Sequence, residues 1–264
     1  MNISPVLLSL PHEKSRKRFL AIQSSLAVRS RNFSPLETQP VTHTRARLSG
    51  HFITLEGIEG SGKTTQAARL AEALRAEGYP VLLTREPGGT PAAEQLRGLL
   101  LNNLTEPLAA ETEAFIILAA RRQHVDQVVV PAIKQGAIVL CDRFTDSTLA
   151  YQGYARGLDL KTLRAMNKLA TGGLTPGLTL LFDLPVAAGL RRRRRDKAGQ
   201  NRLDREARRF HERVRSGFLQ LARRERRRIK LIDAARTPDT IAQDVHRLVV
   251  EWIASKSRRT RRKT

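Results

Sequence analysis

The chain has 264 residues, of which 41% are apolar, so it is long enough to bury the core of one large domain, and its apolar runs are too short to span a membrane. Its formal net charge is +22, but residues 1–50, 191–230 and 256–264 hold more than the whole excess, which argues against a nucleic-acid-binding core. The single cysteine, Cys141, excludes an internal disulfide and suits the cytoplasm.

The two ends of the chain have the composition of tails. Residues 1–50 are rich in Ser, Pro and Arg and contain only two acids, Glu13 and Glu37. Their composition resembles an organellar transit peptide, which would move the protein from the cytoplasm to an organelle. A disordered basic extension and a start codon placed too early are the other two interpretations. Residues 255–264 read as a solvated basic tail.

Between the tails, short apolar runs alternate with segments of helical spacing. In chain order the pattern predicts a strand at 52–56, a helix at 63–77, a strand at 80–86, helices at 91–103 and 111–134, strands at 137–142 and 178–183, helical segments within 186–227, a strand at 229–233 and a closing helix at 238–253. We expect Pro131 to break or kink its helix and a second break near 198–200. This alternation predicts an α/β fold of three layers, with a five-stranded parallel sheet flanked by helices.

The stretch GIEGSGKTT, residues 57–65, lies between the first predicted strand and the first helix. It matches the phosphate-binding P-loop, in which glycines let backbone N–H groups face phosphate oxygens and the helix adds its positive end. We expect Lys63 to reach the β- and γ-phosphates of ATP and the Thr64 hydroxyl to ligate Mg²⁺. The residues predicted to hold the ATP phosphates are Gly57, Ile58, Glu59, Gly60, Ser61, Gly62, Lys63, Thr64 and Thr65.

Charged residues end three other predicted strands. Arg85 and Glu86 precede a PGGT turn, Asp142 and Arg143 end the third strand, and Asp183 ends the fourth in LFDLP. In a parallel sheet the carboxyl ends of the strands meet at one edge, where ligands bind. An aspartate in the position of Asp142 can hold a metal ion, and an arginine such as Arg143 can bind a phosphate with two hydrogen bonds.

These segments together resemble the thymidylate kinase family. The matching motifs are the P-loop, TREPGGT, LAARRQHV, CDRFTDSTLAYQG, LFDLP, NRLDREARRFHERV and KLIDA, in the family's order and spacing over residues 51–254. The resemblance implies phosphoryl transfer from ATP to dTMP with Mg²⁺, in a homodimer. It also implies a mobile, arginine-rich lid.

The resemblance also implies roles for individual residues. The implied dTMP site consists of Glu59 near the sugar 3′-hydroxyl, Arg85 and Arg143 at the phosphate, Arg121 at the thymine edge, and Ser147, Tyr151 and Gln152 around the nucleoside. Asp142 and Glu56 are implied to organise the metal and its water, beside Thr64.

Three features depart from the family's pattern: Ile117, the lid-helix start Asn201-Arg202 where D-R is common, and the uninterrupted run of arginines at 191–195. The family usually has a Phe that stacks on thymine four residues before the thymine-edge arginine, and this chain has Ile117, so Phe115 is a candidate substitute. Some members carry a catalytic arginine in the P-loop, where this chain has Gly60. The catalytic arginine is therefore expected in the lid, within the run 191–195, with Arg192 and Arg194 as the leading candidates beside the catalytic Lys63 and Arg143.

Other functions fit parts of the same pattern. Another P-loop phosphotransferase, such as a deoxynucleoside kinase, would leave the paired phosphate-binding arginines unexplained. A nucleic-acid-binding NTPase would need a basic core and aromatic stacking platforms, but only 5% of the residues are aromatic. A non-catalytic homologue would not need Lys63, Thr64 and Asp142.

Overall fold

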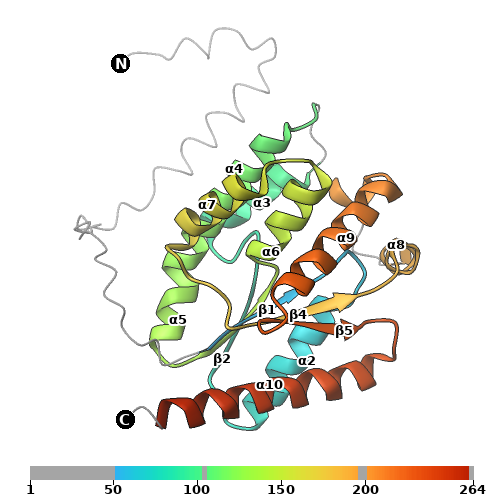
Figure 1. Cartoon of the computed structure of the whole chain (residues 1–264). Coiled ribbons are helices and arrows are strands. Elements are labelled where there is room, and N and C mark those ends of the chain that lie inside the picture. Colours follow the sequence, from blue (N-terminus) through green and yellow to red (C-terminus); the bar gives the residue numbers. More distant parts are fainter. Residues whose placement is uncertain (1–50, 103–105, 196–200, 262–264) are drawn as a thin grey trace, which may run out of the picture. The chain divides into compact units, whose positions relative to one another are not determined.

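The computed structural model is built around one five-stranded sheet (Figure 1). Its strands are β1 (His51–Glu56), β2 (Val81–Arg85), β3 (Ile138–Asp142), β4 (Leu178–Asp183) and β5 (Ile229–Asp233). They lie in the order β2-β3-β1-β4-β5, and every neighbouring pair is parallel. The predicted parallel sheet of five strands is confirmed.

The structure describes residues 51–102, 106–195 and 201–261. The predicted N-terminal extension and the predicted break near 198–200 lie outside the described residues. Within the described residues, no helix combines the length and the apolar character needed to cross a membrane.

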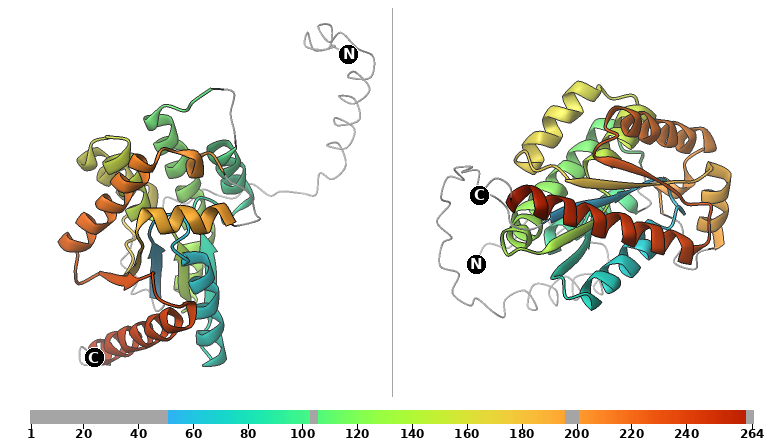
Figure 2. Two further views of the ribbon diagram at one scale, coloured as in Figure 1. Left: turned by 90° about the vertical axis from the view of Figure 1, so that its right-hand side faces the viewer. Right: turned by 60° about the horizontal axis from the view of Figure 1, so that its bottom comes forward.

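Helices cover both faces of the sheet. They are α2 (Lys63–Ala76), α3 (Pro91–Leu101), α4 (Ala110–His124), α5 (Val130–Lys134), α6 (Thr145–Thr148), α7 (Leu160–Thr171), α8 (Val186–Arg195), α9 (Arg208–Arg224) and α10 (Pro238–Arg261), with the π-helical segments η2 (Val125–Val129) and η3 (Leu149–Ala155) and the 3₁₀ turn η4 (Leu203–Arg205). Helices α2 and α10 pack together on one face, and α4, α7 and α9 lie on the other (Figures 1 and 2). This is the predicted three-layer α/β architecture.

The helix ends differ from the sequence prediction in two places. Pro131 does not break its helix, because the chain widens into the π-helical turn η2 just before it. Val130 donates its N–H to the carbonyl of Val125, five residues back, and Pro131 then stands in the first turn of α5, where its missing N–H is not needed. The closing helix α10 continues to Arg261, beyond the predicted end at Ile253.

The central strands are buried on both faces. Ile53 and Leu55 of β1 and Leu180 of β4 are fully buried, and every residue of β3 is buried. In the register of the sheet, Asp142 stands beside Leu55 on one side and beside Arg85 on the other. The carboxyl ends of β1, β2 and β3 therefore bring the P-loop, the TREPGGT motif and the Asp142-Arg143 pair to one edge.

Candidate active site

The P-loop wraps from the end of β1 to the start of α2. Gly57, Gly60 and Gly62 all have positive φ values, of 141°, 68° and 90°, which an L-residue with a side chain rarely adopts. Gly62 immediately precedes the first residue of α2, so the positive end of that helix faces the loop. The sequence folds here into an anion-binding cradle.

The loop also touches the base of α8. A Cβ atom at Gly60 would lie 2.2 Å from the carbonyl oxygen of Gly189, and one at Gly189 would lie 2.5 Å from the carbonyl oxygen of Glu59. Because Gly60 and Gly189 carry no side chain, the backbones of the P-loop and of α8 can lie in direct contact. A longer side chain at position 60 has no room in this arrangement, which explains physically why no P-loop arginine stands here.

Lys63 lies within the loop that it serves. Its Nζ donates to the carbonyl oxygen of Ile58 at 2.7 Å and to Ser61 Oγ at 3.3 Å. Burial, and next the charge of Arg143, lower the pKa of Lys63 from its usual 10.5 to about 8. The ammonium therefore remains the main form at neutral pH, and the negative charge of a bound phosphate would raise this pKa again.

Thr64 and Asp142 form a contact at the foot of the cavity. Thr64 Oγ1 donates to Asp142 Oδ2 at 2.5 Å, while the buried Asp142 Oδ1 has no hydrogen-bond partner among the described residues. A hydroxyl and a carboxylate with a spare buried oxygen are the hard oxygen ligands that Mg²⁺ prefers. The residues present therefore fit a magnesium ion beside the P-loop.

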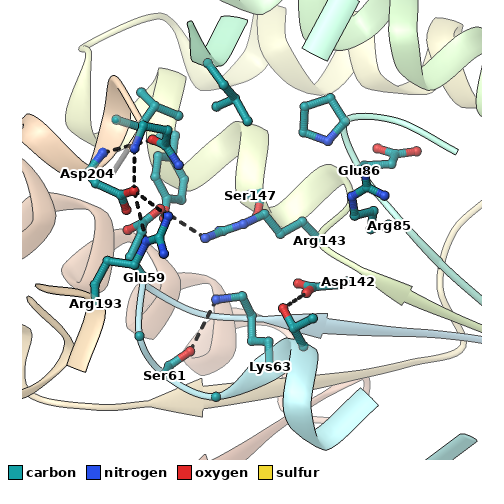
Figure 3. Close-up of a pocket in the computed structure, with 18 of the residues that line it drawn as sticks. Glu59, Ser61, Lys63, Arg85, Glu86, Asp142, Arg143, Ser147, Arg193 and Asp204 are labelled. Atoms are coloured by element: carbon teal, nitrogen blue, oxygen red, sulfur yellow. Dashed lines mark hydrogen bonds and ion pairs between the residues drawn. The ribbon is translucent and has the colours of Figure 1, made fainter. Parts of the chain in front are cut away.

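Arg143 extends across the cavity above Lys63 toward Glu59 (Figure 3). It has φ 71°, the one positive φ of a non-glycine residue within the described residues, and such strained positions concentrate at functional sites. Its Nη1 donates to the carbonyl oxygen of Gly57 at 3.1 Å, and its Nη2 donates to Glu59 Oε1 at 3.0 Å. Arg143 thus joins the DR motif to the P-loop.

Glu59 is the point where several motifs meet. Its Oε1 accepts from Arg143 and from the Tyr151 hydroxyl at 2.6 Å, and its Oε2 lies 3.3 Å from Nδ1 of His211. Burial alone would raise the pKa of Glu59, but Arg143 and the other donors outweigh burial and hold it well below its usual range. The carboxylate is therefore ionised at neutral pH.

Arg121 is held from several sides in the interior. Its Nε donates to Glu86 Oε2 at 2.7 Å, and its Nη1 donates to Thr148 Oγ1 at 2.8 Å and to Asn167 Oδ1 at 2.5 Å. Glu86 in turn lies 3.0 Å from Nδ1 of His124. This network fixes the guanidinium of Arg121 in one orientation.

A cavity of about 720 Å³ opens between these groups. The predicted residues that line it are Glu59, Gly60, Ser61, Gly62, Lys63, Thr64, Thr65, Arg85, Arg121, Asp142, Arg143, Ser147, Tyr151, Gln152 and Arg192. The structure therefore brings nearly all of the predicted nucleotide-binding residues to one place.

Some predicted residues do not reach the cavity. Gly57 and Ile58 contribute carbonyl oxygens inside the loop but do not line the cavity, and Arg194 is exposed outside it. Asp183, the last residue of β4, pairs instead with Arg215 at 2.7 Å. Phe115 is 61% exposed and does not line the cavity either, so its expected substitution for a stacking Phe is wrong.

Glu56 is occupied elsewhere as well. Its Oε1 accepts the N–H of Phe144 at 2.8 Å, and its Oε2 accepts the Ser147 hydroxyl at 2.6 Å, so both oxygens hold the start of α6. Burial and the neighbouring Asp146 raise the pKa of Glu56 to about 8. No hydrogen bond links Glu56 to Thr64 or Asp142 among the described residues, and its role at the metal stays a prediction.

The cavity also has cationic lining that the motifs did not indicate. Arg97 of α3 donates to the carbonyl oxygen of Pro87 at 2.9 Å, and Arg193 contacts Asp204 at 2.9 Å. Arg236, before α10, lines the cavity too. Arg97 could have been found from its helical spacing after the TREPGGT motif, whereas Arg193 could not be told from its four neighbouring arginines.

A parallel α/β sheet with a P-loop, a Thr–Asp pair at its foot and a facing group of arginines defines the class of P-loop phosphotransferases. Within that class, a family model described as thymidylate kinase matches residues 55–245. The chain belongs to the thymidylate kinase family, and the family predicted from the motifs is confirmed.

Individual relatives agree with this assignment. A thymidylate kinase of Desulfovibrio desulfuricans is 48% identical over 213 residues, which cover 78% of this chain and 98% of the relative. One of Syntrophotalea carbinolica is 51% identical over 199 residues, covering 74% and 92%. The crystal structure of a thymidylate kinase from Ehrlichia chaffeensis superposes with a TM-score of 0.61 at 35% identity, covering 76% of this chain and 98% of that one.

Proposed function

We propose that this protein transfers the γ-phosphoryl group of ATP to dTMP, giving dTDP and ADP. The observation that carries the proposal is the pair of cationic groups in one cavity. Figure 3 shows Lys63 of the P-loop with Arg143 and Arg85 above it, and Arg97 lines the same cavity. A cavity with two phosphate-binding groups fits a reaction between two phosphorylated nucleotides.

The P-loop half would hold the donor. Backbone N–H groups of the loop and Lys63 bind the β- and γ-phosphates, and the helix α2 adds its positive end. Mg²⁺ would be held by Thr64 and Asp142 and, when bound, supplies positive charge to the phosphate oxygens.

The other half would hold the acceptor phosphate. Arg143 reaches it from the end of β3, while Arg85 and Arg97 approach from the TREPGGT side. In-line transfer forms a bond between an oxygen of this phosphate and the γ-phosphorus and breaks the bond from that phosphorus to the β-phosphate oxygen. The arginines act by orienting the acceptor and by neutralising two anions that repel each other.

The base would be read by groups with complementary hydrogen bonding. The hydrogen bonds of Arg121 use its Nε and Nη1, which leaves Nη2 as a donor for a pyrimidine carbonyl. Gln152 donates from Nε2 to Glu113, and its buried Oε1 has no partner among the described residues. Arg121 Nη2 as a donor matches the O4 of thymine, and Gln152 Oε1 as an acceptor matches its N3–H. Ile117 lines the same cavity. Glu59, ionised and held by Tyr151, is suited to accept from the sugar 3′-hydroxyl.

A lid arginine would complete the charge around the transferred group. Arg192 and Arg193 both line the cavity, and α8 is anchored to the P-loop by the contact between Gly60 and Gly189. Of the two lid candidates that the sequence favoured, the geometry supports Arg192 and not Arg194.

We also propose an oligomeric state and a cellular location for this chain. We propose a homodimer that pairs through α3, α4 and α7, which lie side by side and leave Leu99, Phe115 and Leu169 52%, 61% and 80% exposed (Figure 1). The fully buried Cys141 thiol and the bacterial origin of the relatives support the predicted cytoplasmic location.

The two halves of the cavity can be tested separately. Replacing Arg97 by Met removes an acceptor-side cation, so the KM for dTMP should rise roughly tenfold or more while the KM for ATP stays unchanged. Steady-state kinetics with each substrate varied in turn, and chromatography of the nucleotide products, make the measurement. A rise in the KM for ATP instead, or a product other than dTDP, would contradict the proposed roles of the two halves.

A further inference from the structure

Glu113 is a buried carboxylate outside the cavity that the proposed reaction does not use. It stands in the first turn of α4, one helical turn before Ile117 and two before Arg121. Its side chain is fully buried, which is costly for a carboxylate unless cations and donors surround it. The groups that donate hydrogen bonds to this carboxylate therefore indicate its role.

Four hydrogen bonds converge on Glu113. Arg202 Nη2 donates to its Oε1 at 2.7 Å, and Arg156 donates to its Oε1 from Nη2 at 3.0 Å and to its Oε2 from Nε at 3.3 Å. The fourth comes from Gln152, whose Nε2 donates to Oε2 at 3.3 Å. All four bonds are donated to Glu113, two of its partners being arginines, so both of its oxygens act as acceptors.

An acceptor-only neighbour decides which way the amide of Gln152 faces. If the amide were turned over, its carbonyl oxygen would meet the carboxylate of Glu113 and repel it. The NH₂ group must therefore face Glu113, and Oε1 faces away from it. That oxygen is buried without a partner among the described residues, and Gln152 lines the cavity. Glu113 thus leaves one unsatisfied acceptor at the cavity.

We infer that Glu113 is a positioning residue for base selection, because it locks Gln152 as an acceptor toward the acceptor nucleotide's base. The inference rests on the proposed function. Thymine presents an N3–H donor to such an acceptor, whereas cytosine presents an unprotonated N3, and two acceptors repel. A freely turning amide would offer its NH₂ to cytosine. The locked amide therefore favours dTMP over dCMP.

The same network offers a matched control. Glu206 also accepts from Arg156, so it belongs to the same group of charges, but it has no hydrogen bond to Gln152 among the described residues. Replacing Glu113 or Glu206 by Gln removes one negative charge from the network in each case. Only the first replacement releases the amide of Gln152. A role of Glu113 in charge balance alone would make the two variants alike.

The experiment compares base selection in Glu113→Gln, Glu206→Gln, Gln152→Ala and the double variant Glu113→Gln/Gln152→Ala. Base selection is the ratio of the inhibition constant of dCMP to the KM of dTMP, which is measurable whether or not dCMP is phosphorylated. We expect this ratio to fall roughly tenfold in Glu113→Gln, the scale of one buried hydrogen bond. It should stay within about twofold of the original in Glu206→Gln.

The double variant tests whether Glu113 acts through Gln152. Its ratio should equal that of Gln152→Ala alone, since without the amide there is nothing for Glu113 to orient. Additive effects in the double variant, or an equal fall in Glu206→Gln, would overturn the inference.

Glu113→Asp covers the case in which Glu113→Gln fails to fold. It keeps the charge for both arginines but is one methylene shorter, which breaks the 3.3 Å contact to Gln152. We expect the ratio to fall with the melting temperature retained, and an unchanged ratio in this folded variant would overturn the inference. If the unaltered protein does not phosphorylate dTMP, the proposed function fails first. If it does and the ratio resists these changes, the inference alone fails.

Discussion

Single residues around the cavity divide into those proposed to touch the nucleotides and those that hold these residues in place. Lys63, Arg143 and Glu59 were predicted from motifs, because a P-loop and a DR pair at a strand end fix both residue type and position. Arg97 and Glu113 were not predicted, although the helical spacing after TREPGGT could have indicated Arg97. Glu113 looks like an ordinary helical acid in the sequence, and its partner Arg202 comes from a distant segment. Motifs indicate residues that touch the ligand more readily than residues that support them.

The arginines of α8 differ in position and should differ in effect. Arg192 and Arg193 line the cavity, whereas Arg194 is exposed outside it. An arginine that stabilises the transferring phosphoryl group is worth about 10³-fold or more in kcat. We expect Ala at 192 or at 193 to cause a loss of this kind, measured as kcat at saturating ATP and dTMP. Arg194→Ala is the matched control and should change kcat by less than about threefold. Equal, small effects at all three positions would contradict a catalytic role for Arg192 and Arg193, and silence at 191, 195 and 202 as well would exclude a lid arginine.

Ile117 stands where the family has a stacking Phe. It is buried and lines the cavity, so in the proposed complex an aliphatic side chain would cover the base. An aromatic ring would add about 1 kcal/mol of base stacking, which corresponds to a roughly fivefold lower KM for dTMP. We expect Ile117→Phe to show this with kcat little changed. An unchanged or higher KM in a variant with the original melting temperature would mean that the base does not lie against this position.

At the scale of helices and strands, the sheet was predictable and the helix irregularities were not. Five apolar runs with turn residues between them predict five buried strands, because a parallel sheet is covered on both faces. The π-helical turns η2 and η3 leave no such pattern, since one inserted residue does not change composition. Yet η3 carries Tyr151 and Gln152, so the irregular segment is part of the site.

The pairing of β1 with α10 gives a test of stability against pH. The ring of His51 lies edge-on to that of Trp252 at 5.2 Å, and burial, followed by the charge of Lys256, lowers the pKa of His51 below 6.5. As the pH falls through about 6.5, the unfolded chain therefore binds a proton at His51 more readily than the folded chain does. The free energy of unfolding decreases as the pH falls through this range. His51→Phe keeps the ring contact and removes this proton.

Urea unfolding at pH 8 and at pH 5.5 measures the effect. We expect the original chain to lose more unfolding free energy than His51→Phe between these two values. If both lose the same amount, the histidine is not held in its neutral form.

At the scale of the whole molecule, the neighbouring strands β1 and β3 bring the P-loop and the Asp142-Arg143 pair to the same edge of the sheet. The proposed dimer surface lies elsewhere, on α3, α4 and α7. Phe115→Asp places a charge in that surface and should convert a dimer to a monomer in sedimentation at micromolar concentration. Leu231→Asp is the matched control, because Leu231 is also 56% exposed but stands on the edge strand β5. A dimer that survives Phe115→Asp, or dissociates equally in Leu231→Asp, would contradict this surface.

The central claim is that one cavity holds ATP opposite a pyrimidine monophosphate. The most direct test is kcat/KM with ATP and Mg²⁺ for four acceptors: dTMP, dCMP, AMP and thymidine. We predict that the kcat/KM for dTMP exceeds that for each of the others by at least about a hundredfold. Thymidine lacks the phosphate that Arg143 and Arg97 would bind, and the other bases lack the hydrogen-bonding edge that Arg121 and Gln152 would recognise. Thymidine accepted as well as dTMP would mean that the facing arginines do not hold an acceptor phosphate. AMP accepted as well as dTMP would mean that the base is not read, and either result would contradict the account.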